Sequence, residues 1–153
     1  SQTTQAAKIL ITRSCLFRVF SMPRKRRTKK KLWSKQSEYT RRDGSIVLMD
    51  STWEVMMATR LDELEIIWER DPNIKLEYRT RGGRKRNYIP DFYLPEFDLY
   101  IEVKGYWTDA ARHKMKDIIK RNPGKICILE SLADIGKLTK NIKPSYGSLA
   151  ENI

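Results

Sequence analysis

Two carboxylates and a lysine occur at a spacing that suits metal-assisted hydrolysis. Glu102 and Lys104 stand two residues apart in the alternating segment 99–104, and Asp91 precedes Glu102 by eleven residues. Side chains two apart on a strand share one face, so the carboxylate and the ammonium are expected side by side. The loop at residues 94–98 lets the chain return, which is expected to bring Asp91 beside Glu102. The three side chains are therefore predicted to converge.

The metal-ligating atoms that these side chains offer are all oxygens. Oxygen ligands alone select a hard divalent ion, which predicts Mg²⁺ with Mn²⁺ able to replace it. Two like charges in close contact favour a bound cation over two bare carboxylates. Such an ion lowers the pKa of its water and stabilises charge on phosphate oxygens, while Lys104 orients the nucleophile or stabilises the same charge. The chemistry expected here is the hydrolysis of phosphodiester bonds.

The elements that must position these residues alternate between helices and strands. Apolar residues recur at helical spacing from about residue 52 to 65, after possible N-caps at residues 50–52. Alternating or apolar runs and turn residues predict the remaining elements: strands at 46–48, 66–69, 74–80, 88–92, 99–104 and 126–129, helices at 108–121 and 131–138, and a basic turn at 81–86. This order predicts a mixed α/β or α+β core.

The positive charge of the chain is concentrated at its N-terminal end. The chain has 31 Lys and Arg against 19 Asp and Glu, and its first 35 residues hold 11 of these cations and no acid. We therefore expect a basic arm at residues 1–35 and a nearly neutral domain at residues 36–153, with nucleic acid as the partner. Two cysteines and one histidine exclude a zinc finger, a His/Cys metal cluster and a disulfide framework. No apolar run approaches the roughly 18 residues of a membrane span, so a soluble intracellular protein without a membrane partner is expected.

Cations in three places are candidate contacts to DNA phosphates. The segment 24–31 has seven cations in eight positions, too self-repelling to fold alone. The candidates are Arg24, Lys25, Arg26, Arg27, Lys29, Lys30 and Lys31 in the arm, Arg84, Lys85 and Arg86 in the basic turn, and Lys114 on the second helix. A nuclear-localisation signal or a solvated tail would have the same composition as the arm. Residues 1–21 resemble an organellar transit peptide, and the alternative is an upstream extension before Met22.

The flanking sequence carries a resemblance to a known group of nucleases. Pro90-Asp91 followed by Glu102-Val103-Lys104 resembles the PD-(D/E)xK motif, and residues 88–95 and 101–107 resemble the phage endonuclease I family of junction-resolving enzymes. Residues 51–54, 67–69 and 144–147 extend this resemblance, which spans about residues 50–147. It implies a restriction-endonuclease-like fold, a mixed sheet flanked by helices.

The resemblance also implies roles for individual residues. Asp91, Glu102 and Glu54 would be catalytic and ligate the metal, Val103 is counted with the metal-ligating positions, and Lys104 would assist the attacking water. Glu69 is a weaker acidic candidate. A second resemblance, over residues 39–44 and 49–54, is to small phage homing endonucleases, which cut duplex DNA at a specific site.

The expected function is therefore that of a Mg²⁺-dependent deoxyribonuclease acting on branched DNA as a Holliday-junction resolvase does. Two alternatives remain: a site-specific homing endonuclease, and a non-catalytic nucleic-acid-binding module. Cuts on two strands imply a homodimer, because they need two sites related by symmetry. A phage origin would place the protein in the infected bacterial cytoplasm, and a transit peptide would place it in an organelle.

Plainer interpretations of the same residues stay open. Ser51 and Glu54 have the spacing of a helix capping box, in which Glu54 would bind backbone N–H groups. Glu102 and Lys104 could form the solvated face of an edge strand. His113 lies on the second helix, where it either contacts phosphate or faces solvent.

Overall fold

The computed structural model of the chain describes residues 36–152. The predicted arm at residues 1–35, with its candidate targeting segment and its cations at positions 24–31, lies outside the described residues. The chain divides into two compact units, Ser1–Thr52 and Trp53–Ile153. Within the described part, no helix has the length and apolar character needed to cross a bilayer.

The described part of the first unit is a β-hairpin. Strands β1 (Ser37–Thr40) and β2 (Ile46–Met49) pair antiparallel, with Thr40 opposite Ile46. Asp43 stabilises the turn, since its Oδ1 accepts a hydrogen bond from the Ser45 backbone N–H at 2.9 Å. The turn and the second strand were both expected from the sequence, and the first strand was not.

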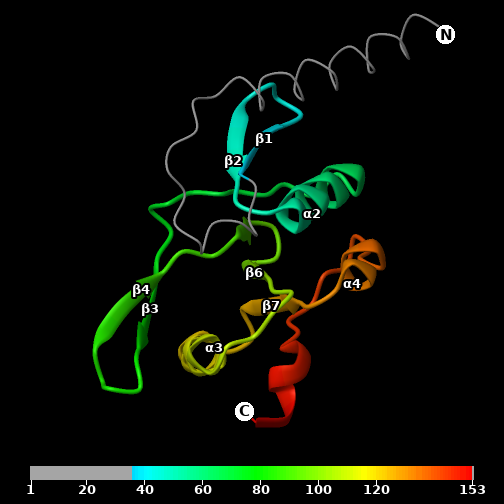
Figure 1. Cartoon of the computed structure of the whole chain (residues 1–153). Coiled ribbons are helices and arrows are strands. Elements are labelled where there is room, and N and C mark those ends of the chain that lie inside the picture. The colour runs from blue at the N-terminus through cyan, green and yellow to red at the C-terminus, as the bar shows by residue number, and fades with distance from the viewer. Residues whose placement is uncertain (1–35, 153) are drawn as a thin grey trace, which may run out of the picture. The chain divides into compact units, whose positions relative to one another are not determined.

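The second unit combines helices with two small sheets (Figure 1). Its elements follow in the order α2 (Thr52–Glu63), β3 (Leu76–Arg79), β4 (Lys85–Tyr88), β5 (Phe92–Leu94), β6 (Leu99–Val103), α3 (Asp109–Arg121), β7 (Ile126–Leu129), α4 (Leu132–Gly136) and the 3-10 helix η2 (Gly147–Asn152). Strands β3 and β4 form an antiparallel hairpin, and β5, β6 and β7 form a mixed sheet in that order. The coarse expectation of a mixed α/β or α+β core is thus confirmed.

Strand β6 is the centre of the mixed sheet. It pairs antiparallel with β5 and parallel with β7, so its backbone is hydrogen-bonded on both edges. A parallel pair needs a crossover connection, which α3 supplies between β6 and β7. The helix begins after Thr108, whose side chain accepts a hydrogen bond from the Ala111 N–H at 3.1 Å.

Helix α3 packs the two small sheets into one core. Its apolar side chains Met115, Ile118 and Ile119 join Ile126 and Ile128 of β7 with Leu76, Tyr88 and Leu149. The β3–β4 hairpin is also fixed to α3 by polar contacts, because the Asp117 carboxylate accepts a hydrogen bond from the Arg79 N–H at 2.8 Å. The His113 Nε2 lies 3.2 Å from the Arg79 carbonyl oxygen. His113 therefore contacts the hairpin backbone.

Two local predictions differ from the structure. Residues 66–69 were expected to form a strand, but only Glu69 pairs, in an isolated bridge to Tyr93. The apolar alternation was real, since Ile66 and Trp68 are buried, but β5 spans only three residues and offers little edge to pair with. The single strand expected at residues 88–92 is absent: β4 ends at Tyr88 and β5 begins at Phe92, so Asp91, which was expected to end a strand, lies one residue before β5.

Candidate active site

The register of the β5–β6 pair explains how Asp91 meets Glu102. Phe92 lies opposite Ile101, so one step further along the same register Asp91 is opposite Glu102. Side chains directly opposite each other on antiparallel strands point to the same face, about 5 Å apart at their Cβ atoms. The carboxyl group of Asp91 therefore lies beside that of Glu102, whose negative charge acts on it. A separation of eleven residues in sequence is thus closed by one tight hairpin.

Glu102 is buried rather than solvated. Its residue is 6% exposed, and it lies on the central strand of the sheet. The hydroxyl of Tyr88, at the end of β4, donates a short hydrogen bond to its Oε2. The interpretation of Glu102 as part of a solvated edge strand is therefore wrong, since helix α3 and the β3–β4 hairpin cover this face.

Asp91 is held from both its side chain and its backbone. Its Oδ2 accepts a hydrogen bond from the Val103 N–H at 2.8 Å, while its carbonyl oxygen accepts one from Arg70 at 3.2 Å. The same Arg70 nitrogen lies 2.9 Å from the Glu54 carboxylate. Both members of this ion pair are largely enclosed, with side chains 15% and 9% exposed. Arg70 therefore connects the first turn of α2 to the backbone of Asp91.

Burial and like charge disfavour ionisation of this carboxyl pair. Burial, with the negative charges of Glu102 and Glu54, raises the pKa of Asp91 well above its usual range. Burial also raises the pKa of Glu102, although the Tyr88 hydroxyl and the charge of Lys104 oppose that rise. The pKa of Tyr88 is itself raised well above 10, by burial and then by the charge of Glu102. A proton or a cation is needed to hold both carboxyl groups together.

Two lysines lie at this pair. Lys104 follows β6, and its charge acts on Glu102; its Nζ lies 5.8 Å from the ring centroid of Trp107. Lys114 extends from α3, with its Nζ 4.9 Å from the centroid of the Tyr88 ring. Burial lowers the pKa of Lys114, and the charge of Glu102 opposes this change. Lys114 was expected to be a DNA contact on the second helix, and the structure places it beside the carboxyl groups.

The carboxyl oxygens of Asp91 and Glu102 suit a hard divalent cation, but they supply only two protein ligands. Among residues 36–152, no three acidic, His or Cys side chains are grouped so as to hold a metal ion. Mg²⁺, however, retains several waters and is commonly bound by one or two carboxylates with substrate phosphates. Asp91 and Glu102 supply two such carboxyl groups from opposite positions of neighbouring chain segments. Glu54 is engaged with Arg70, and Val103 contributes its N–H to Asp91.

The basic turn expected at residues 81–86 is shorter in the structure: Lys85 and Arg86 belong to strand β4, and residues 80–84 form the tip of the β3–β4 hairpin. Its candidate contacts Arg84, Lys85 and Arg86 are all exposed. The tip is ordered by its own hydrogen bonds, since the Thr80 N–H donates to the Arg84 carbonyl oxygen at 2.9 Å. Lys85 also pairs with Glu77 at 3.2 Å. The other candidate contacts, in the arm, lie outside the described residues, and Glu69 is exposed and pairs through its backbone.

Tyr88 and Arg70 were not assigned a role from the sequence. Tyr88 lies 14 residues from the carboxylate that it binds, and Arg70 lies 16 residues from Glu54 and 21 from Asp91. Their positions depend on how the β3–β4 hairpin and α2 pack, and local sequence patterns do not predict that packing. The one available signal was that Tyr88 directly precedes the motif.

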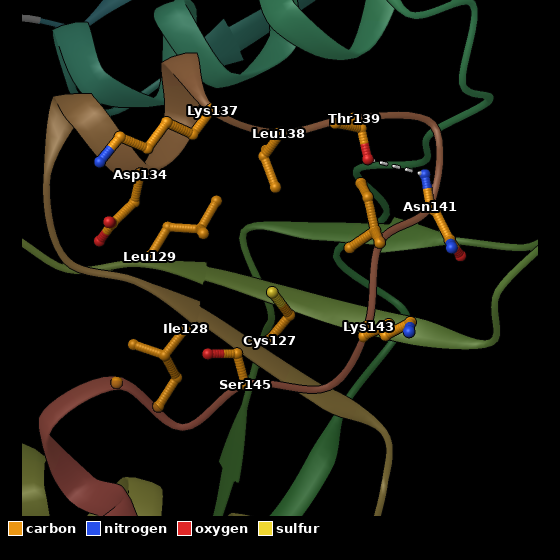
Figure 2. A pocket seen from close by; sticks show the side chains of 12 residues that line it. Cys127, Ile128, Leu129, Asp134, Lys137, Leu138, Thr139, Asn141, Lys143 and Ser145 are labelled. Atoms are coloured by element: carbon orange, nitrogen blue, oxygen red, sulfur yellow. Dashed lines mark hydrogen bonds between the residues drawn. The ribbon is translucent and has the colours of Figure 1, made fainter.

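A separate cavity of about 410 Å³ lies between β7, α4 and the segment that follows α4 (Figure 2). Leu129, Lys137, Thr139 and Lys143 are among the residues that line it, whereas none of Asp91, Glu102 and Lys104 does. The cavity is thus distinct from the carboxyl pair.

The sequence matches no protein-family model, no curated protein and no solved structure. The function must therefore be argued from the residues and their arrangement.

Proposed function

We propose that this protein is a metal-dependent DNA endonuclease of the restriction-endonuclease-like fold. The observation that carries the proposal is the placement of Asp91 opposite the buried Glu102, with Lys104 two residues beyond Glu102, just after strand β6. Burying two carboxyl groups together destabilises a protein, and such pairs occur chiefly where function requires them. A central mixed-sheet strand with a helix crossover is the setting that the motif resemblance implies.

The residues of this chain would act on a phosphodiester as follows. Asp91 and Glu102 would hold Mg²⁺, which when bound supplies a water of lowered pKa and neutralises charge on the phosphate oxygens. Lys104 lies on the same face as Glu102, where its ammonium orients the nucleophile or stabilises the charge that develops on phosphorus oxygens. The Val103 N–H and the Tyr88 hydroxyl fix the two carboxyl groups.

Branched DNA is the substrate that the proposal favours, and paired cuts would require a homodimer. The exposed cations of the β3–β4 hairpin suit contacts to the phosphate backbone, which give affinity without sequence specificity. A DNA whose shape rather than sequence is recognised is consistent with such contacts.

The test uses a labelled four-way junction and a linear duplex of the same arm sequence, each with Mg²⁺ and with EDTA. We expect Mg²⁺-dependent paired nicks in the junction, lost in Glu102→Gln, in which the glutamine oxygen still accepts from Tyr88. Glu96→Gln is the matched control, since Glu96 is exposed in the β5–β6 loop. Cleavage of both DNAs would favour a site-specific or general endonuclease instead. Tight, salt-sensitive binding without cleavage would favour a binding module and overturn the proposal.

A further inference from the structure

Lys104 and Lys114 are two partly buried ammonium groups that lack a direct partner in the described chain. Among residues 36–152, neither ammonium group makes a hydrogen bond or an ion pair, and each lies near an aromatic ring, Trp107 for Lys104 and Tyr88 for Lys114. An ammonium carries three N–H donors, and charged groups removed from water are normally paired. This arrangement points to an anion that the two lysines share.

The two lysines are close enough to act on the same group. The Lys114 Nζ lies 4.9 Å from the centroid of the Tyr88 ring, whose hydroxyl donates to Glu102, and Lys104 follows Glu102 by two residues, on the same face. Lys104 comes from β6 and Lys114 from α3, which are joined by a short connection and packed in one core. Their like charges repel, and an anion between them would remove that repulsion.

Glu102 determines the position of this anion relative to the proposed metal. A phosphate held by lysine ammonium groups beside a metal-ligating carboxylate would lie where the metal could also reach its oxygens. A phosphodiester offers two non-bridging oxygens to the two ammonium groups and the metal.

We propose that Lys104 and Lys114 form a two-lysine phosphate site that binds the phosphodiester to be cleaved. The inference rests on the proposed nuclease function and makes Lys114 a catalytic residue instead of an outer DNA contact. Lys104 and Lys114 would each bind one non-bridging oxygen, so that the negative charge developing on phosphorus is balanced from two elements of the fold.

The experiment measures single-turnover cleavage at saturating enzyme, which removes differences in DNA affinity. The main variant is Lys114→Met, because methionine keeps the apolar stem over the Tyr88 ring and removes only the charge. Lys120→Met is the matched control: Lys120 lies six residues further along α3 and is exposed. Urea unfolding of each variant verifies that it is folded.

We expect Lys114→Met to slow cleavage by about a hundredfold, the size seen when one transition-state hydrogen-bond donor is removed. Lys114→Arg should recover part of the rate, and Lys120→Met should stay within about twofold of the wild type. In the presence of Ca²⁺, the slope of log affinity against log salt should fall by about 0.9 in Lys114→Met, as for one lost phosphate contact. Wild-type cleavage by a folded Lys114→Met variant would overturn the inference.

A second readout separates this inference from the nuclease proposal. Binding of the phosphodiester dinucleotide thymidylyl-thymidine is followed by backbone amide NMR shifts, which need no cleavage. If the wild type cuts no DNA but binds the dinucleotide and Lys114→Met does not, the nuclease proposal fails and the phosphate site stands. If both proteins bind the dinucleotide equally, the phosphate site fails whether or not the wild type cuts DNA.

Discussion

Replacing Asp91 with asparagine should stabilise the metal-free protein while abolishing cleavage. The asparagine carbonyl oxygen can accept the Val103 N–H, as the Asp91 Oδ2 does at 2.8 Å. The amide N–H₂ can donate to Glu102, so that an attractive contact replaces two like charges. The buried pair thus loses its repulsion without losing its hydrogen bonds.

The expected gain follows from the repulsion between the negative charges of Asp91 and Glu102. Two unit charges about 4 Å apart repel by about 4 kcal/mol at an effective dielectric constant of 20. The wild type avoids part of this repulsion by keeping a proton, since the pKa values of both Asp91 and Glu102 are raised. A gain of about 1 to 4 kcal/mol at pH 8 is therefore expected for Asp91→Asn.

The sign of the pH dependence follows from the same shifts. A pKa that is raised in the folded state gives stability that is complete below the unfolded value, about 4 for these groups, and is lost as the pH rises through the folded value. The wild type without metal should therefore become less stable between pH 5 and pH 8. The advantage of Asp91→Asn should shrink over the same interval as the pH is lowered.

The assay is urea unfolding in EDTA at pH 5 and pH 8, repeated with Mg²⁺. Mg²⁺ should stabilise the wild type, by about 2.7 kcal/mol at a concentration of 100 times Kd, and should have little effect on the variant. Asp98→Asn is the matched control, because the pair of Asp98 and Lys125 is exposed and should contribute little to stability. Two results would refute the electrostatic argument. One is a folded Asp91→Asn protein that is less stable than the wild type at pH 8. The other is a stability advantage over the wild type that is as large at pH 5 as at pH 8.

Three further changes have definite expected outcomes. Arg70→Ala should lower the free energy of unfolding by about 3 kcal/mol, because it removes the ion pair between Arg70 and the enclosed Glu54 carboxylate, and adding Glu54→Gln should recover part of that loss in urea unfolding. Gly147→Ala should cost about 1 to 3 kcal/mol, since the residue has φ +55 and a Cβ would overlap the Glu130 carboxylate, yet cleavage per folded molecule should be unchanged. Cys127 is buried, and burial raises the pKa of its thiol to about 11. In a Cys15→Ser background, this thiol should therefore react with iodoacetamide at pH 8 only after urea unfolding. Rapid reaction of the folded protein would contradict its burial.

The elements around the motif could be predicted because their patterns are local. The alternation at residues 99–103 gives β6, and the apolar spacing of Met115, Ile118 and Ile119 gives α3. A tight hairpin between residues 91 and 102 was also within reach, since short loops return strands into register. The convergence of Asp91 with Glu102 followed from that hairpin.

The remainder of the site depends on contacts between distant segments. Glu102 is buried because Tyr88 and α3 cover the face of β6 that carries it. The alternation of a strand sequence does not show whether its polar face is covered by another element. The partnership of Glu54 with Arg70 likewise joins a helix to a loop. At residues 66–69 the alternation of buried and exposed side chains was predicted correctly, but the strand was not formed. The neighbouring strand β5 is too short to pair with more than Glu69.

The central place of β6 has a consequence for how the protein opens. Its Tyr100 N–H donates to the Lys125 carbonyl oxygen and its Val103 N–H to Asp91, and the N–H of Lys104, which follows the strand, donates to the Leu129 carbonyl oxygen. Amide hydrogens of this strand should exchange with solvent only when the whole second unit unfolds, whereas the tip of the β3–β4 hairpin should exchange by local opening. The carboxyl pair is thus built into the most cooperative part of the fold, while the exposed cations at the hairpin tip can move without disturbing it.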